Sequence, residues 1–139
     1  MNRIECARHN AEIYGVADRI EFIVGNYFDL LPFLKADVVF LSPPWGGPEY
    51  LKAPKFDIQK MGGLDGKQIF TDTLTITPNI AYFLPRNTDP AQLLELGSDY
   101  CELEGNYINE KLKTVTAYFG ELVQTDEPDT VTDDQFTEV

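Results

Sequence analysis

The chain has 139 residues, of which 43% are hydrophobic and 12% aromatic, enough to bury the core of one ordinary domain. No apolar run approaches the roughly 18–20 residues that span a bilayer, and the charged first stretch is unlike a secretory signal. The formal net charge of −12 argues against a broad nucleic-acid-binding surface, which is normally basic.

Half of this net charge lies at the carboxyl end. Because that stretch contains little that could pack, we predict a folded domain over residues 1–123 and an acidic disordered tail over 124–139. The domain could still carry a small basic site. The acidic residues of the tail, which no basic residue accompanies, are Asp126, Glu127, Asp129, Asp133, Asp134 and Glu138.

Two cysteines, Cys6 and Cys101, lie far apart and lack the spacing of a zinc site. We therefore expect reduced thiols in a cytosolic or nuclear protein and no bound metal.

The first part of the chain alternates helical and extended patterns, as α/β proteins do. Apolar residues at helical spacing predict a helix over residues 2–14, which Gly15 ends. A β-rich run predicts a short strand over 19–24, and residues 26–34 suggest a turn or short helix. The continuous apolar run at 37–41 is typical of a parallel strand buried on both faces.

A long loop follows, over residues 45–65, with the glycine pairs and prolines of a functional loop. Residues 66–77 are ambiguous, because their threonines favour a strand while their apolar spacing fits one helical face. We favour the helix. Residues 79–84 predict a second buried strand that ends at Pro85.

The last part of the chain predicts one helix and two strands. Asp89 or Thr88 can cap a helix that begins at Pro90 and runs to about Leu96. Alternating patterns over 100–107 and 112–119 then predict an antiparallel pair of strands at a sheet edge. A short turn joins the two.

The segment Ser42-Pro43-Pro44-Trp45-Gly46-Gly47-Pro48 directly follows the predicted strand at 37–41. In open α/β sheets, ligands bind at the carboxyl ends of the strands. Each proline keeps the residue before it extended, so the carbonyls of Ser42 and Pro43 become rigid acceptors. Such acceptors can position a planar amine for in-line attack on a methyl sulfonium, while Trp45 offers a stacking face that suits a cationic base.

This segment resembles the signature of amino-group methyltransferases: a strand, then an acidic, asparagine or serine residue, two prolines and an aromatic residue. Its extension through Tyr50 is similar to the trimethylguanosine synthases, which are RNA cap guanine-N2 methyltransferases. Further matches to that family occur in order at residues 4–11, 35–41, 82–87 and 109–120. The resemblance covers nearly everything from Arg3 to Val123.

The resemblance implies a class I, Rossmann-like α/β fold that uses S-adenosylmethionine as methyl donor. The implied reaction converts the 7-methylguanosine cap of small nuclear and nucleolar RNA to 2,2,7-trimethylguanosine. The implied partners are capped small RNA and the proteins of small nuclear and nucleolar ribonucleoproteins, in the nucleus and cytoplasm, with no membrane. The implied site residues are Ser42, Pro43 and Trp45 for catalysis, Trp45, Tyr50, Arg86 and Lys113 for the cap base and phosphates, and Asn26, Tyr27 and Ser42 for the methyl donor.

The sequence departs from the family in two respects. Asn26 stands where an aspartate is usual, although its carbonyl can still accept a hydrogen bond from an adenine amine. The first two strands and the glycine-rich turn of the fold do not precede the helix that starts the chain, so we expect an N-terminally truncated domain that binds S-adenosylmethionine weakly or not at all.

Other interpretations stay open at this stage. The chain could be a non-catalytic fragment that keeps part of the cap pocket, or an amino-methyltransferase for adenine amines or protein glutamine. Individual residues also have plainer interpretations: a proline-rich turn for the Ser42 segment, packing or turn roles for Tyr50 and Asn26, and solvated surface positions for Arg86 and Lys113.

Overall fold

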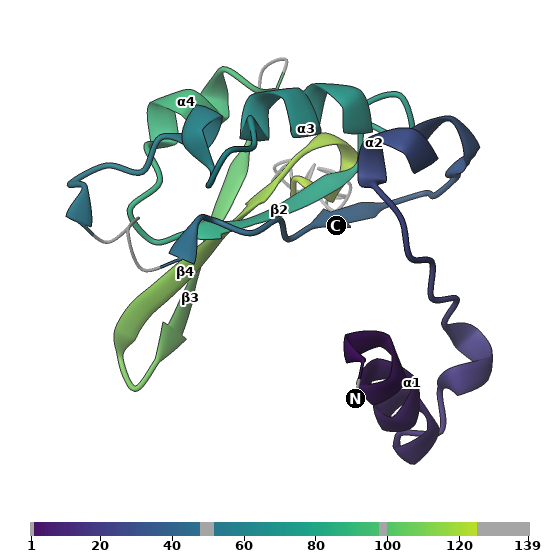
Figure 1. The fold of residues 1–139 in the computed structure, drawn as a ribbon. Helices are drawn as coiled ribbons and strands as arrows, with labels where there is room; N and C mark the ends of the chain where they lie inside the picture. The colour runs from purple at the N-terminus through teal and green to yellow at the C-terminus, as the bar shows by residue number, and fades with distance from the viewer. Residues whose placement is uncertain (1, 48–51, 98–99, 125–139) are drawn as a thin grey trace, which may run out of the picture. The chain divides into compact units, whose positions relative to one another are not determined.

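The computed structural model describes residues 2–47, 52–97 and 100–124 (Figure 1). The chain divides into two compact units, Met1–Phe33 and Leu34–Val139. Each unit is described by itself. The predicted tail lies outside the described residues from position 125 onward, and the predicted domain boundary at 123 stays a prediction.

The first unit is helical. Helix α1 (Arg3–Ile13) begins with a capping box, in which Asn2 accepts from the backbone of Ile4 and Glu5 accepts from the backbone of Asn2. Gly15 adopts a φ of 67° just after the helix, as a C-terminal glycine does. The predicted helix over 2–14 is therefore confirmed.

After α1, the first unit contains short helical turns and an extended stretch between them. The 3₁₀ turn η1 (Ala17–Arg19) is followed later by α2 (Tyr27–Leu30) and η2 (Leu31–Phe33), which confirms the predicted turn or short helix. The strand predicted over 19–24 is wrong, because those residues carry no strand pairing in the described structure. Ile20 is extended, with φ −122° and ψ 120°, but an extended segment becomes a strand only beside a partner.

The second unit contains a four-stranded sheet of order β1-β2-β4-β3. Strand β1 (Val39–Leu41) pairs in parallel with β2 (Ile80–Pro85), while β4 (Lys111–Tyr118) is antiparallel to β2 and β3 (Glu102–Ile108). These strands confirm the predicted strand at 79–84 and the predicted antiparallel pair. The arrangement is the mixed α/β class expected from the sequence.

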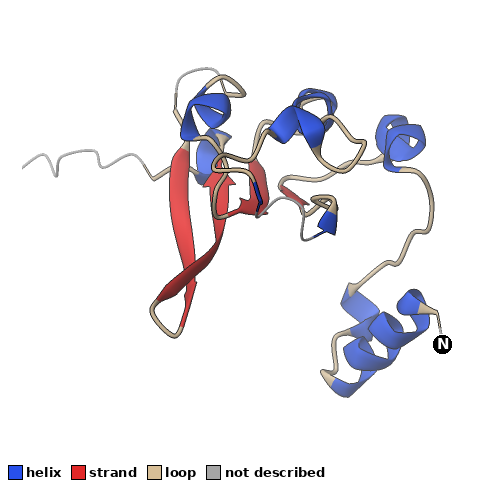
Figure 2. Ribbon diagram, turned by 60° about the vertical axis from the view of Figure 1, so that its left-hand side comes forward, coloured by secondary structure: helices blue, strands red, loops and turns tan. Residues whose placement is uncertain are grey.

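Two helices cover one face of this sheet, as Figure 1 and Figure 2 show. Helix α3 (Gly66–Thr73) is capped by Asp65, and α4 (Pro90–Leu94) by Asp89, so both predicted helices are confirmed. The unit also contains the short turns η4 (Ile58–Lys60) and η5 (Gly120–Leu122).

The core lies between α3 and the sheet. The ring of Phe70 stacks on Tyr82 at 6.4 Å between centroids and meets Phe119 at 4.6 Å. The hydroxyl of Tyr82 donates to the carbonyl of Gly66 at 3.1 Å, so β2 is joined to the start of α3. Desolvation raises the pKa of Tyr82 well above its ordinary value, and the buried phenol stays neutral.

Strand β1 differs from its prediction in one respect. Leu41 is buried, but Val38 and Phe40 are 48% and 62% exposed. The prediction of burial on both faces is wrong for the described residues, because β1 is an edge strand and α3 and α4 cover only one face of the sheet.

Candidate functional site

The segment Ser42–Trp45 leaves the carboxyl end of β1, as predicted. Because β1 and β2 are parallel, with Leu41 opposite Tyr82, the carboxyl ends of both strands meet at one edge of the sheet. Ser42 is exposed there, and Pro43 and Trp45 are half-buried. This edge of the sheet therefore carries the backbone carbonyls of Ser42 and Pro43 and, two residues further along the chain, the indole ring of Trp45.

Trp45 is anchored on β2 through Phe83. The indole Nε1 donates to the carbonyl of Phe83 at 3.3 Å, and the two rings lie 5.4 Å apart with their planes inclined by 35°. Phe83 also meets Phe40 at 6.1 Å. Three aromatic rings from two strands and one loop thus form a cluster that holds the indole in place.

Sequence reasoning missed Phe83. The sequence gives no signal for this role, which appears only in the structure, where Phe83 is the half-buried residue in a strand whose other five residues are buried. An aromatic side chain at that position needs a neighbour on the open face of the sheet, and Trp45 supplies it.

The register of β2 and β4 brings Arg86 and Lys113 to neighbouring positions. Pro85 pairs with Thr114 across β2 and β4, so the next residues along each strand are Arg86 and Lys113. The guanidinium of Arg86 donates to the carbonyl of Leu112 at 3.4 Å. Both side chains are exposed, which suits contact with phosphates.

A β-bulge lies at Lys113. The pairing of β3 and β4 passes from Asn106 with Thr114 to Tyr107 with Leu112, so Lys113 has no opposite residue in β3. Bulges redirect a side chain from the regular alternation of a strand and often occur beside functional sites. The pairing of β4 with β2 brings Lys113 to the end of β2, next to Arg86 and three residues beyond Phe83, which anchors Trp45.

A cavity of about 300 Å³ opens beside Trp45. Its floor contains two glycines in close contact, since a Cβ added at Gly62 would lie 2.7 Å from the Cα of Gly46. Both residues have positive φ, 88° for Gly46 and 58° for Gly62. Each position therefore favours glycine for its backbone conformation as well as for the close contact. The residues that line this Trp45 cavity are Trp45, Gly46, Ala53, Lys55, Phe56, Asp57, Lys60 and Gly62.

The remaining predicted site residues are Asn26, Tyr27 and Tyr50. Asn26 caps α2, where its Oδ1 accepts from the backbone of Phe28 at 3.1 Å, and half-buried Tyr27 packs its ring against Phe28. Both belong to the first unit. Tyr50 lies outside the described residues.

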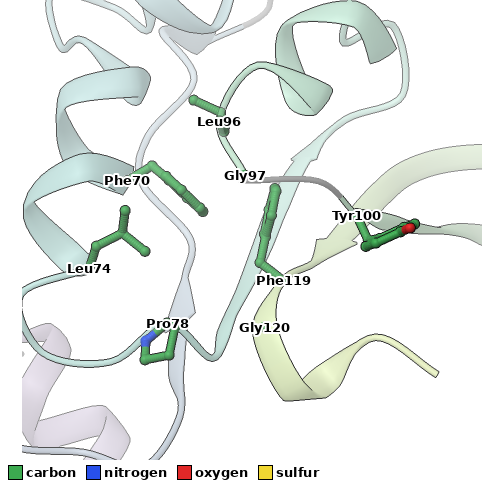
Figure 3. A pocket seen from close by; sticks show the side chains of 8 residues that line it. All are labelled: Phe70, Leu74, Pro78, Leu96, Gly97, Tyr100, Phe119 and Gly120. Carbon is green, nitrogen blue, oxygen red and sulfur yellow. The ribbon is translucent and has the colours of Figure 1, made fainter. Parts of the chain in front are cut away.

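A second cavity, of about 270 Å³, lies over the core between α3 and the end of β4. Figure 3 shows Phe70 and Phe119 in its wall, with Leu74 and Tyr100 at its sides. Its lining residues are Phe70, Leu74, Pro78, Leu96, Gly97, Tyr100, Phe119 and Gly120. None of these is a predicted site residue, and the lining carries no charged side chain that could orient a nucleotide.

Several features bear on other kinds of site. None of the described helices combines the length and apolarity needed to cross a membrane. Within the described ranges, no three His, Cys, Asp or Glu side chains gather where they could hold a metal ion. Cys6 is an exposed free thiol, whereas burial raises the pKa of the half-buried Cys101 to about 11, which keeps that thiol protonated at neutral pH.

Comparison with known proteins agrees with this geometry. Residues 1–122 match the sequence model of the RNA cap guanine-N2 methyltransferase family. The chain is 39% identical over 102 residues to the trimethylguanosine synthase of Schizosaccharomyces pombe, covering 69% of this chain and 43% of that protein. It is 40% identical over 99 residues to the trimethylguanosine synthase of Saccharomyces cerevisiae, covering 67% of this chain and 31% of that protein.

A more distant relative has another substrate in its name. The ribosomal protein uL3 glutamine methyltransferase of Bordetella pertussis is 27% identical over 112 residues, which cover 75% of this chain and 35% of that protein. The chain spans less than half the length of each of these three relatives. On the family match, which takes in both units, the chain belongs to the RNA cap guanine-N2 methyltransferases.

Proposed function

We propose that this chain acts in transfer of a methyl group from S-adenosylmethionine to the N2 amine of 7-methylguanosine caps on small nuclear and nucleolar RNA. The observation that carries the proposal is the position of Trp45, which is anchored on β2 at the sheet edge. Arg86 and Lys113 lie at neighbouring positions at the end of the same strand. Membership of the cap methyltransferase family supports the same reaction.

Trp45 is suited to select a methylated cap. N7 methylation gives guanine a positive charge, and the indole face attracts a stacked cation more strongly than a neutral ring. Phe83 fixes the indole, so little side-chain freedom is lost when a base stacks on it. Stacking of a base on an aromatic side chain contributes about 1–3 kcal/mol.

Ser42 and Pro43 would position the amine. The lone pair of an exocyclic amine is delocalised into the purine ring, so the amine is a poor nucleophile. The backbone carbonyls of these residues can accept its hydrogens and orient the nitrogen toward the methyl donor. Their place at the carboxyl end of β1, next to Trp45, fits this role.

Arg86 and Lys113 would bind the phosphates of the cap. They form a small basic site on a chain whose formal charge is −12, so phosphate binding depends on these few side chains. The planar guanidinium of Arg86 matches a phosphate with two parallel hydrogen bonds, and Lys113 adds a point charge. Tyr50 is proposed as a third phosphate contact from the resemblance.

S-adenosylmethionine supplies an electrophilic methyl group on a sulfonium. Some residues of the chain have groups that could contact this methyl donor. The Oδ1 of Asn26, which caps α2, keeps a second lone pair that could accept from the adenine amine, and the hydroxyl of Ser42 is exposed at the sheet edge. Tyr27, next to Asn26, is proposed as a neighbouring contact.

A protein glutamine is the second candidate acceptor, favoured by the similarity to a glutamine methyltransferase. Its side-chain amide is also a planar, conjugated amine that the carbonyls of Ser42 and Pro43 could orient. It carries neither a positive ring nor phosphates, however, and so leaves Trp45, Arg86 and Lys113 without a purpose.

A methyl-transfer assay tests the proposal. The chain is incubated with S-adenosylmethionine and m7GpppG, GpppG or a glutamine peptide, and the products are identified by mass spectrometry. We expect N2 methylation of m7GpppG alone, with loss of that product in Trp45→Ala. Equal transfer to GpppG or to the peptide would contradict the proposal, and m7G-selective binding without transfer would favour the non-catalytic fragment.

A further inference from the structure

The lining of the Trp45 cavity includes two lysines, Lys55 and Lys60, which we call the lysine wall. Neither was singled out by its sequence pattern. Their side chains are 69% and 83% exposed, so both are accessible to a ligand from solvent. The cavity thus has an aromatic side and a cationic side, a combination that matches the base and the phosphate of a nucleotide.

Each lysine is paired with a carboxylate. The Nζ of Lys55 lies 2.8 Å from Asp89, and the Nζ of Lys60 lies 3.4 Å from Asp57. Exposed pairs of this kind are weak, typically below about 1 kcal/mol. A phosphate that offers more than one acceptor can therefore displace them.

The two carboxylates do not depend on the lysines for partners. Asp89 also accepts from the backbone of Ala91 as the cap of α4. Asp57 accepts from the amide of Gln92 at 2.9 Å and from the backbone of Gln59 at 3.1 Å, and the Gln92 bond is the main reason that the pKa of Asp57 is lowered. If a phosphate draws either lysine away, the carboxylate that the lysine leaves still has other hydrogen-bond partners.

The segment that carries Lys55 is bonded to the residues that follow β2. The amide of Asn87 donates to the carbonyl of Ala53 at 3.0 Å, and the backbone of Phe56 donates to Asn87 at 2.7 Å. Phe56 also bridges in parallel to Thr88. Lys55 is therefore fixed beside the residues that directly follow Arg86, the proposed cap-phosphate contact.

We propose that the RNA strand beyond the cap leaves Trp45 along this wall, with Lys55 and Lys60 binding its phosphodiesters. The inference rests on the proposed function, because the cap at Trp45 sets where the strand begins. The volume of about 300 Å³ is at the lower end of the roughly 300–1,000 Å³ of small-ligand sites, which fits a single nucleotide. An acidic peptide would use the lysines but not the aromatic side.

Equilibrium binding tests this inference, with m7GDP, a short m7G-capped oligoribonucleotide and the same oligonucleotide without a cap. The wild-type chain should bind the capped oligonucleotide more tightly than m7GDP. In Lys55→Ala/Lys60→Ala this gain should fall about tenfold, and the slope of log affinity against log salt should fall by about 1.4, as for two single-strand phosphate contacts. Lys67→Ala is the matched control, because Lys67 is an exposed lysine of α3 outside the cavity lining and should keep the full gain.

The outcomes separate the two proposals. A gain and a salt slope that survive in the double variant, or that fall equally in Lys67→Ala, would overturn the lysine wall. So would competition by a polyglutamate peptide as strong as that by the uncapped oligonucleotide. If m7GDP and GDP bind equally, the proposed function fails, while the effect of the double variant on the uncapped oligonucleotide still decides the role of the lysines.

Discussion

Phe83 shows how one residue can decide the quality of a stacking site. It contributes a carbonyl to the Trp45 indole and a ring beneath it, yet contacts no proposed substrate atom. It is therefore a positioning residue. Its importance arises only when the loop after β1 folds back over β2, a contact across 38 residues that local pattern cannot reveal.

Phe83→Leu should weaken m7GDP binding by about two- to tenfold, since an aromatic pair contributes about 0.5–1.5 kcal/mol beyond its buried area. The fold should persist, because leucine keeps most of the volume and apolar character. Titration of m7GDP measures the affinity, and the emission of the chain's single tryptophan reports whether the indole has moved into water. Tyr107→Leu, on the exposed hairpin end, is the control; an equal loss there would contradict a specific role for Phe83.

At the scale of elements, local chemistry predicted most of the second unit correctly. The helix over α3 was ambiguous in sequence, and the cap at Asp65 together with the apolar face of Ile69 and Phe70 explains why the helix prevails over the β-favouring threonines. The side chain of Thr73 accommodates to the helix by donating to the carbonyl of Ile69 at 2.6 Å.

Asp65→Ala should lower the free energy of unfolding by about 1 kcal/mol, because the carboxylate accepts from the backbone of both Lys67 and Gln68 at the start of α3. Urea unfolding followed by circular dichroism measures the change. Asp65→Ser should recover most of the stability, since serine also caps helices. If serine and alanine are equally destabilising, the cap is not the cause.

The failed predictions share a physical cause. The strand expected at 19–24 and the two-sided burial expected of β1 both depend on neighbouring strands and helices rather than on the residues themselves. The candidate site divides in the same way. Ser42, Trp45, Arg86 and Lys113 stand in recognisable motifs, whereas the roles of Phe83, Lys55 and Lys60 arise from contacts between distant segments.

At the scale of the molecule, an acidic chain presents a few basic groups near one end of its sheet. The net charge of −12 repels RNA in general, so the exposed cations near Trp45 would give binding both its place and its dependence on salt. This contrast suits an enzyme family that must recognise one cap rather than bind any RNA. The chain belongs to that family over residues 1–122, and the reaction, substrates and partners of the whole protein are proposals.

The recognition of a cationic cap base by Trp45 is tested most directly by the intrinsic fluorescence of the chain. Trp45 is the single tryptophan, so its emission reports on that ring alone. We expect m7GDP to quench the emission saturably and to bind at least about tenfold more tightly than GDP, as a cation–π contact with a desolvated face would give. Equal quenching by the two nucleotides, or none by m7GDP, would contradict the account.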